Sequence, residues 1–279
     1  MLKKIKELFI PQQLLKGNCG IEREMLRVDK NGYLSFTDHP EIFGDKVLNP
    51  YITTDFSESQ VEVITPALDK IEETYSFLKA LYDIVALEIG DEILWPQSMP
   101  CFIPEDDEIP VAKYSEEGRE AEEYRNKLLK KYGGKKQLIS GIHYNYSFNE
   151  EIIRKLYESS DKELTYKEYK NSIYLKVARN YLRYRWIIVY LLGAAPVIHE
   201  SFLNGCSCKL KQISEDGYTL DGAVSHRNGE CGYRNKEELY PNYDTVEDYV
   251  ESINKYVNDG VIDSHKELYS QVRLKAKEP

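Results

Sequence analysis

Carboxylates inside strand-like segments are the residues of this sequence that could most readily do chemistry. Glu22 and Glu24 stand two positions apart in one such segment, and Gln60 and Glu62 do so in another. Alternate side chains of a strand share a face, so each pair points to one side of its strand. Burying a carboxylate is costly unless it is paired or bound to a metal. These acids therefore predict either a cation site or a set of ion pairs.

A further acid, Asp55, precedes the second segment, where the end of a loop could turn it toward the same place. Several convergent carboxylates suit a hard cation, and magnesium in particular where phosphates supply the remaining ligands. The alternative is a solvated sheet face on which the acids pair with Arg23 or Arg27. Spacing alone leaves both interpretations open.

The segment 137–148 is predicted to be a strand with two unlike faces. We expect one face to be core-like, with Leu138, Ser140, Ile142, Tyr144, Tyr146 and Phe148. The other face gathers hydrogen-bonding groups and a glycine that leaves room for a ligand, with Gln137, Ile139, Gly141, His143, Asn145 and Ser147. His143 could bind a metal or position a carboxylate, although a single strand histidine is more often a half-buried polar residue.

The glycine-rich motifs that cradle phosphates are absent from the sequence. It contains neither G-x-x-x-x-G-K-S/T nor G-x-G-x-x-G. Any nucleotide would therefore be held through cations on carboxylates and not by a glycine loop.

The formal net charge of −10 narrows the range of partners. Nucleic acids and anionic membranes attract positive charge, so neither is expected as a partner. The most apolar stretch, 186–198, is too short to span a bilayer and contains Pro196. The N-terminus lacks the long apolar core of an export signal. We expect a soluble, cytoplasmic protein.

The five cysteines form no dense framework, and we expect reduced thiols. Cys206, Cys208 and Cys231 could hold a soft metal. A C-x-C spacing without C-x-x-C or nearby histidines is, however, a weak signal for such a site.

The remaining pattern predicts the elements that must position these groups. Asn31-Gly32 indicates a hairpin turn between strands at 21–28 and 33–37, because both residues tolerate positive φ. Helices are expected at 69–89, where Asp69 can act as the cap, and at 115–132, 151–158, 166–193 and 245–258. This pattern favours one α+β domain over residues 1–279, with helices around an antiparallel sheet.

Six segments are more specific than these patterns. They are GIEREMLRV (20–28), ITTDFSESQVEVITP (52–66), WPQSMPC (95–101), YRNKLLKKYG (124–133), QLISGIHYNYSF (137–148) and VARNYLRYRWIIVYLLGAAP (177–196). In wording, order and spacing they resemble the bacterial glutamate–cysteine ligases, from about residue 17 to the end. The ending KELYSQVRLKA (266–276) is closer to the form that is fused to a glutathione synthetase domain.

The resemblance implies a fold and a reaction. The fold would be a funnel-like antiparallel sheet, related to that of glutamine synthetase, with the active site inside. The enzyme would join the γ-carboxylate of glutamate to the amine of cysteine, the first step of glutathione biosynthesis. ATP, with Mg²⁺ as cofactor, would phosphorylate the carboxylate before the amine attacks. Glutamate, cysteine and ATP are thus the expected small-molecule partners.

The resemblance also assigns roles to single residues. The positions that match the family's magnesium-binding acids are Glu22, Glu24, Asp55 and Glu62, with His143 beside them. Tyr124, Arg125 and Gln137 match substrate-binding positions, and Asn145 is expected to contact the nucleotide. The segment 223–235 departs from the family's usual wording, yet Arg227 and Tyr233 keep the spacing of a substrate-binding arginine and tyrosine. No catalytic acid or base is implied.

The family's catalytic domain continues beyond the last residue of this chain. We therefore expect the N-terminal part of that domain, with an incomplete metal cage and ATP site and little activity by itself. Its partner would be the missing C-terminal half or a second copy. Two alternatives remain open, namely a γ-glutamyl ligase for another amine and a non-catalytic module that binds a metal or a partner chain.

Overall fold

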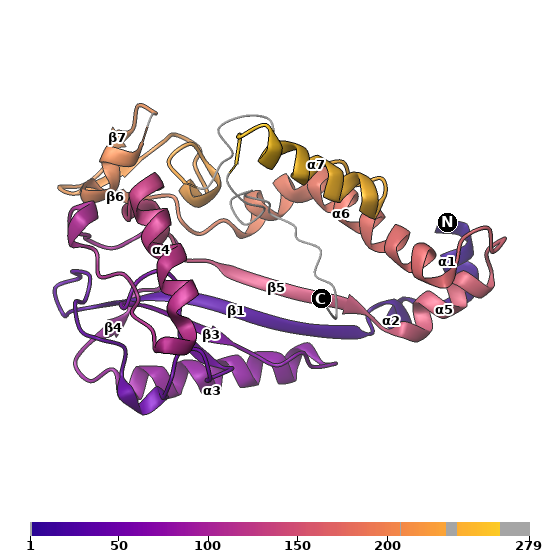
Figure 1. The fold of residues 1–279 in the computed structure, drawn as a ribbon, viewed down its shortest axis with the longest axis horizontal. Coiled ribbons are helices and arrows are strands. Elements are labelled where there is room, and N and C mark those ends of the chain that lie inside the picture. Colours follow the sequence, from indigo (N-terminus) through magenta and orange to yellow (C-terminus); the bar gives the residue numbers. More distant parts are fainter. Residues whose placement is uncertain (1, 207, 233–238, 263–279) are drawn as a thin grey trace. The chain divides into compact units, whose positions relative to one another are not determined.

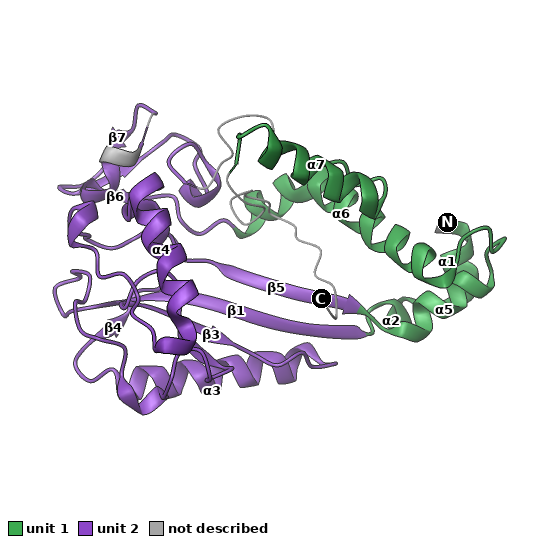
Figure 2. Ribbon diagram, in the orientation of Figure 1, with its two compact units in different colours: residues 1–16, 148–192, 233–279 green, residues 17–147, 193–232 purple. Residues whose placement is uncertain are grey.

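The structure, a computed structural model, describes residues 2–206, 208–232 and 239–262. Contacts divide the chain into two compact units (Figure 2). Residues 1–16, 148–192 and 233–279 make up the first unit, and residues 17–147 and 193–232 the second. The expectation that residues 1–279 form the N-terminal part of one catalytic domain stays a prediction.

A five-stranded sheet is the frame of the second unit (Figure 1). Its strands are β1 (Gly17–Val28), β2 (Ile52–Thr54), β3 (Gln60–Ile64), β4 (Ile93–Leu94) and β5 (Ile142–Phe148). The order is β2-β3-β1-β4, and β5 also pairs with β1. The β1–β3, β1–β4 and β2–β3 pairs are antiparallel, so the expected combination of helices with an antiparallel sheet is confirmed.

One face of this sheet is covered by the helix α3 (Ile71–Glu88). Met25 of β1 and Val61 of β3 point toward the helix and pack with Leu81 and Val85 in one buried cluster. Burial of these apolar side chains holds the helix against the sheet and fixes which face of β1 and β3 remains for other groups.

Two local expectations are wrong. Lys70, not Asp69, is the N-terminal cap residue of α3, and it makes no side-chain cap hydrogen bond. The chain does turn at Gly32, which has φ +84°, but the expected return strand 33–37 is reduced to an isolated bridge between Val28 and Leu34. On this edge of β1 the Arg27 N–H already donates to the Ser59 carbonyl, so the residues that lead into β3 occupy it.

The predicted strand 137–148 begins later than expected. Residues Lys135–Leu138 form a 3-10 helix, η4, and β5 starts at Ile142. The face expected to be core-like is exposed at Ile142 (68%), Tyr144 (58%) and Tyr146 (39%), so that expectation is wrong for these side chains. The helix α3 packs on β1 and β3, and this face of β5 lies beyond it.

The second unit has further, shorter elements. They are the helix α4 (Arg119–Tyr132), the strands β6 (Ile198–His199), β7 (Lys211–Gln212) and β8 (Gly217–Thr219) of a small sheet, and the 3-10 helices η1 (Glu41–Phe43), η2 (Asp106–Glu108), η3 (Glu116–Gly118), η5 (Glu200–Gly205) and η6 (His226–Asn228). Of these, α4 and η6 carry residues that the sequence singled out.

The first unit is helical in its described part. Its helices are α1 (Leu2–Leu8), α2 (Pro11–Leu14), α5 (Glu150–Glu158), α6 (Tyr166–Leu192) and α7 (Val246–Asn258). The last three lie close to the expected ranges. Asn149 caps α5 and Thr245 caps α7, each accepting a backbone N–H in the first turn. Phe9, Ile152 and Leu156 form a small core. Within the described residues, no helix is long and apolar enough to cross a bilayer.

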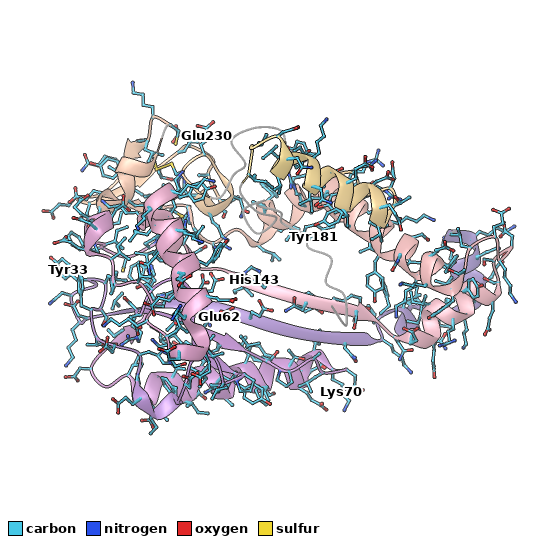
Figure 3. All side chains as sticks on the ribbon, viewed as in Figure 1. Tyr33, Glu62, Lys70, His143, Tyr181 and Glu230 are labelled. Carbon is cyan, nitrogen blue, oxygen red and sulfur yellow. A yellow bond between two sulfur atoms is a disulfide. The ribbon has the colours of Figure 1, made fainter. Side chains whose placement is uncertain are left out.

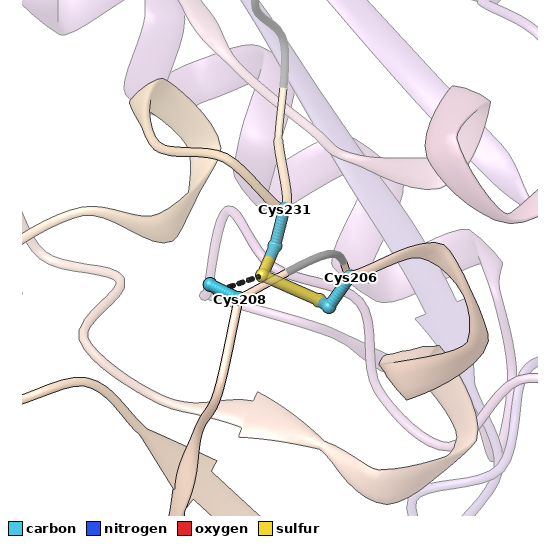
Figure 4. The surroundings of a disulfide bond; sticks show 3 residues. All are labelled: Cys206, Cys208 and Cys231. Carbon is cyan, nitrogen blue, oxygen red and sulfur yellow. Dashed lines mark hydrogen bonds between the residues drawn. A yellow bond between two sulfur atoms is a disulfide. The ribbon is translucent and has the colours of Figure 1, made fainter.

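The cysteines are not all thiols. Cys206 and Cys231 form a disulfide (Figure 4), so the expectation of reduced thiols is wrong for this pair. Cys19, Cys101 and Cys208 are free. The disulfide joins residues 25 positions apart, and nothing in their spacing indicates that η5 and the loop after η6 meet.

Candidate active site

Two carboxylates face each other across the centre of the sheet. In the β1–β3 ladder Glu24 is the direct partner of Glu62, and Glu22 lies two residues before Glu24 on the same face. Their neighbours Met25 and Val61 point to the other face, under α3. The alternation predicted from the sequence therefore brings three acids to the face that α3 leaves uncovered.

The strand β5 supplies polar partners to two of these acids. His143 Nε2 lies 3.1 Å from Glu24 Oε1, and the Gly141 N–H donates to Glu24 Oε2 at 2.7 Å. Asn145 Nδ2 donates to Glu22 Oε1 at 2.8 Å. The charge of His143 also acts on Glu62 of β3, and Figure 3 labels both residues. The predicted polar face of β5 is thus confirmed at these positions.

The turn between β2 and β3 carries the fourth acid. The Asp55 N–H donates to the Gln60 carbonyl at 3.0 Å, which closes the turn. Arg125 of α4 donates its Nε–H to the Asp55 carbonyl oxygen. The Asp55 side chain is half-buried. It lies near enough to Glu24 for the Glu24 charge to raise its pKa, and its own charge raises the pKa of Glu62.

Burial and neighbouring charges raise the pKa values of Asp55 and Glu62. Burial and then the Glu24 charge raise the pKa of Asp55 to about 7. Burial, followed by the charges of Asp55 and Glu24, raises the pKa of Glu62 to about 8. Positive charges on Arg125 and Arg227 oppose the rise at Asp55 without cancelling it. Burial thus disfavours the ionised form of Asp55 and of Glu62, and the neighbouring carboxylates add to this effect.

The alternative of simple ion pairing does not fit. Arg27 forms its ion pair with Glu92 at 2.6 Å, and Arg23 lies over the ring of Tyr82 at 5.3 Å. Neither arginine therefore forms the ion pair with the acids of β1 or β3 that the sequence allowed as an alternative.

The donor set suits a hard divalent cation. Four partly buried carboxylates that repel one another offer oxygen ligands and need a positive charge nearby. Mg²⁺ or Mn²⁺ supplies that charge and prefers oxygen ligands. Among the described residues, no three His, Cys, Asp or Glu side chains already form a closed metal site. Glu24 is instead held by Gly141 and His143, and Glu22 by Asn145. The residues fit the ion in charge and ligand type, and the cage itself is not preformed.

Arg227 on η6 lies against the glycine that precedes β5. Its Nη1–H donates to the Ile139 carbonyl at 3.2 Å. A Cβ added at Gly141 would lie 2.4 Å from Arg227 Nη2, so only glycine leaves room for the guanidinium. The guanidinium thus lies close to the peptide that binds Glu24, and it is among the positive charges that act on Asp55.

The structure describes three of the other four candidate substrate-binding residues. Tyr124 and Arg125 are half-buried neighbours on α4, and Gln137 is half-buried on η4. Tyr233 lies outside the described residues.

One further residue of this region was not indicated by the sequence. Tyr114 lies under the Arg125 guanidinium, 4.8 Å from Arg125 Cζ to the ring centroid, and donates its O–H to the Thr54 carbonyl at 3.1 Å. It therefore connects α4 to the residue before Asp55. Nothing distinguishes it in the sequence, because it is one of 23 tyrosines and precedes its helix.

Comparison with known families gives one match over almost the whole chain. The family model described as glutamate-cysteine ligase matches residues 2–278. The glutathione biosynthesis bifunctional protein GshAB of Clostridium perfringens is 46% identical over 278 residues, covering 99% of this chain and 36% of that protein. The protein of the same name from Desulfotalea psychrophila is 45% identical over 95% of this chain and 34% of its own length. The chain thus spans about a third of these relatives.

Solved structures give the same result. A bifunctional glutathione synthetase from Pasteurella multocida matches with a TM-score of 0.83 and 35% identity, over 100% of this chain and 34% of that one. A glutamate–cysteine ligase from Francisella tularensis, in complex with AMP, matches with a TM-score of 0.79 and 32% identity, over 87% of this chain and 48% of that one.

Proposed function

Because the chain belongs to the glutamate–cysteine ligase family, as its sequence resemblance indicated, we propose that it forms the cation-binding part of an ATP-dependent ligase. The ligase would join the γ-carboxylate of glutamate to the amine of cysteine. The observation that supports this role is the pair Glu24 and Glu62, opposed in the β1–β3 ladder and joined by Asp55. The pKa values of Asp55 and Glu62 are raised.

The reaction has two steps. The glutamate γ-carboxylate attacks the γ-phosphorus of ATP, which forms γ-glutamyl phosphate and releases ADP. The cysteine amine then attacks the acyl carbon and loses a proton, the amide bond forms, and phosphate leaves. Both reactants of the first step are anions, so their repulsion has to be offset before they can meet.

Glu22, Glu24, Asp55 and Glu62 would hold Mg²⁺ ions, with His143 beside them. When bound, such ions neutralise charge on the phosphates and on the transferred group. The chain's own hydrogen bonds orient the acids: Gly141 and His143 fix the two oxygens of Glu24, and Asn145 fixes one of Glu22. This preorganisation lowers the cost of bringing the reactants together. Asn145 is also the residue that we assign to the nucleotide.

The basic and aromatic residues around the cluster would bind the substrates. Arg227, which lies close to Gly141, presents a guanidinium that suits a substrate carboxylate as a bidentate partner. Arg125 keeps a positive charge beside Asp55, where substrate or phosphate charge would gather. Tyr124, Gln137 and Tyr233 are assigned to the cysteine pocket on the resemblance of their positions.

The rest of the active site would come from the parts of the relatives that this chain does not span. Its partners would therefore be glutamate, cysteine, ATP and the remaining portion of a longer ligase, or a second copy. The funnel-like closure of the sheet, its relation to glutamine synthetase and a cytoplasmic location belong to the same proposal.

Cation binding tests this function without requiring turnover. Mn²⁺ binding, followed by electron paramagnetic resonance, should weaken at least about tenfold in Glu62→Gln. The matched control is Glu88→Gln, which changes an exposed acid at the C-terminal end of α3. Equal Mn²⁺ affinity in the wild type and Glu62→Gln would remove this cluster as a cation site. Mass spectrometry of products formed with cysteine and with other amines then decides the amine that is used.

A further inference from the structure

Three cysteine sulfurs meet at one place outside the carboxylate cluster (Figure 4). Cys206 and Cys231 are joined by a disulfide, and the free Cys208 Sγ lies 3.1 Å from Cys231 Sγ. Cys231 is fully buried, whereas Cys206 and Cys208 are partly exposed. A buried central sulfur therefore has two alternative partners, both within reach of small molecules.

Cys231 belongs to the same tight turn as Arg227. The Gly229 N–H donates to the His226 carbonyl at 3.1 Å, and the Gly232 N–H donates to the Gly229 carbonyl at 3.2 Å. A Cβ at Gly232 would lie 2.1 Å from the Arg227 carbonyl oxygen, so the two ends of the turn are in close contact. The bond at Cys231 thus anchors the turn that presents the Arg227 guanidinium to Gly141.

The third sulfur makes exchange possible without an outside oxidant. The Cys208 thiolate attacks Cys231 Sγ, a Cys208–Cys231 bond forms, and the Cys206–Cys231 bond breaks. The electron pair leaves on Cys206 Sγ, which takes up the proton that Cys208 lost. Two molecules of a small thiol reduce either disulfide to two protein thiols and are themselves oxidised to one small disulfide.

We propose that Cys206, Cys208 and Cys231 form a thiol–disulfide exchange site for low-molecular-weight thiols, and that its redox state sets how firmly the Arg227 turn is held. The exchange is independent of the proposed ligase function. Only the consequence for substrate binding at Arg227 rests on that function.

Disulfide mapping tests the exchange. The protein is equilibrated in buffers from reduced to oxidised glutathione, quenched in acid, alkylated and digested. Electron-transfer fragmentation distinguishes Cys206 from Cys208. We expect both Cys206–Cys231 and Cys208–Cys231 linkages in the wild type. Cys206→Ser should still form a Cys208–Cys231 disulfide in oxidised glutathione, and Cys206→Ser/Cys208→Ser should form none.

The matched control is Cys101→Ser. Cys101 is a buried free thiol that donates only to the Phe102 carbonyl, a hydrogen bond that a serine hydroxyl can keep, so the linkages should be those of the wild type. The exchange is overturned if Cys208 remains a thiol in every buffer, in the wild type and in Cys206→Ser alike.

Hydrogen exchange tests the coupling to Arg227 and uses no ligase activity. Amides of residues 225–232 should exchange about tenfold faster in the reduced protein than in the oxidised protein. Equal exchange in the two states would overturn the coupling. Because neither measurement depends on turnover, failure here is distinct from failure of the proposed ligase function.

Discussion

Glu24 and Glu62 occupy directly opposed positions in the β1–β3 ladder, on the sheet face away from α3. Side chains opposed in this way have Cβ atoms about 5 Å apart, and like charges there destabilise a sheet. Burial, and then the charges of Asp55 and Glu24, raise the pKa of Glu62 to about 8. Such a pair does not stabilise the fold. The presence of the two acids therefore favours a cation-binding role over a structural one.

The first prediction concerns pH and stability in the absence of divalent cations. The pKa of Glu62 rises from 4.5 to about 8 and that of Asp55 from 3.8 to about 7. Between about pH 4 and pH 8 the folded protein keeps protons that the unfolded chain releases. The free energy of unfolding should therefore fall as pH rises, by on the order of a few kcal/mol. Urea denaturation at pH 5, 6.5 and 8 measures this.

Variants identify which group causes this pH dependence of the free energy of unfolding. Glu62→Gln should flatten the pH dependence and be more stable than the wild type at pH 8, because the repelling charge is gone. Glu88→Gln, at an exposed position at the C-terminal end of α3, should keep the wild-type pH dependence of stability. A wild-type free energy of unfolding that rises with pH over this range would contradict the prediction.

The second prediction concerns His143. Its hydrogen bond to Glu24 raises the pKa of the imidazole above 6.5. The stabilisation from this pair is fully present below pH 6.5 and is lost as pH rises through the raised value. NMR titration of the imidazole should give a lower pKa in Glu24→Gln than in the wild type. Equal values would mean that Glu24 is not the partner of His143 in solution.

Much of this site follows from period-two alternation. It places Glu22 with Glu24 and Gln60 with Glu62, and the polar face of β5 emerges from the same rule. Alternation does not give the register between strands, because that depends on the loops that join them. The opposition of Glu24 and Glu62 and the approach of Asp55 are therefore visible only in the folded chain.

The failures of sequence reasoning have a common physical cause. Tyr144 and Tyr146 look like core residues, but a side chain is buried only where another element covers it, and α3 extends over β1 and β3. Cys206 and Cys231 are distant in sequence, and a loop without periodicity brings them together. Tyr114 connects α4 to the residue before Asp55, and the sequence around Tyr114 does not indicate this contact.

The third prediction concerns the glycine before β5. In Gly141→Ala the new Cβ would lie 2.4 Å from Arg227 Nη2, so the guanidinium has to move. In a protein that contains the whole ligase, the KM for glutamate should rise at least about tenfold, since a carboxylate fork depends on geometry. The control is Gly20→Ala on β1, where the added Cβ would meet no atom closer than 3.6 Å. An unchanged KM in Gly141→Ala would separate Arg227 from glutamate binding.

The fourth prediction concerns Tyr114, which supports the Asp55 turn from α4. Tyr114→Phe keeps the ring under Arg125 and loses only the hydrogen bonds with Thr54, so the free energy of unfolding should fall by about 1 kcal/mol. Tyr114→Leu also removes the cation–π contact and should cost roughly 1 kcal/mol more. Urea denaturation measures both. Hydrogen exchange at Asp55, whose N–H bonds to Gln60, should accelerate more in Tyr114→Leu than in Tyr114→Phe. If the two variants are equal in stability and in exchange, the stack with Arg125 does not hold the turn, and Asp55 is positioned by β2 and β3 alone.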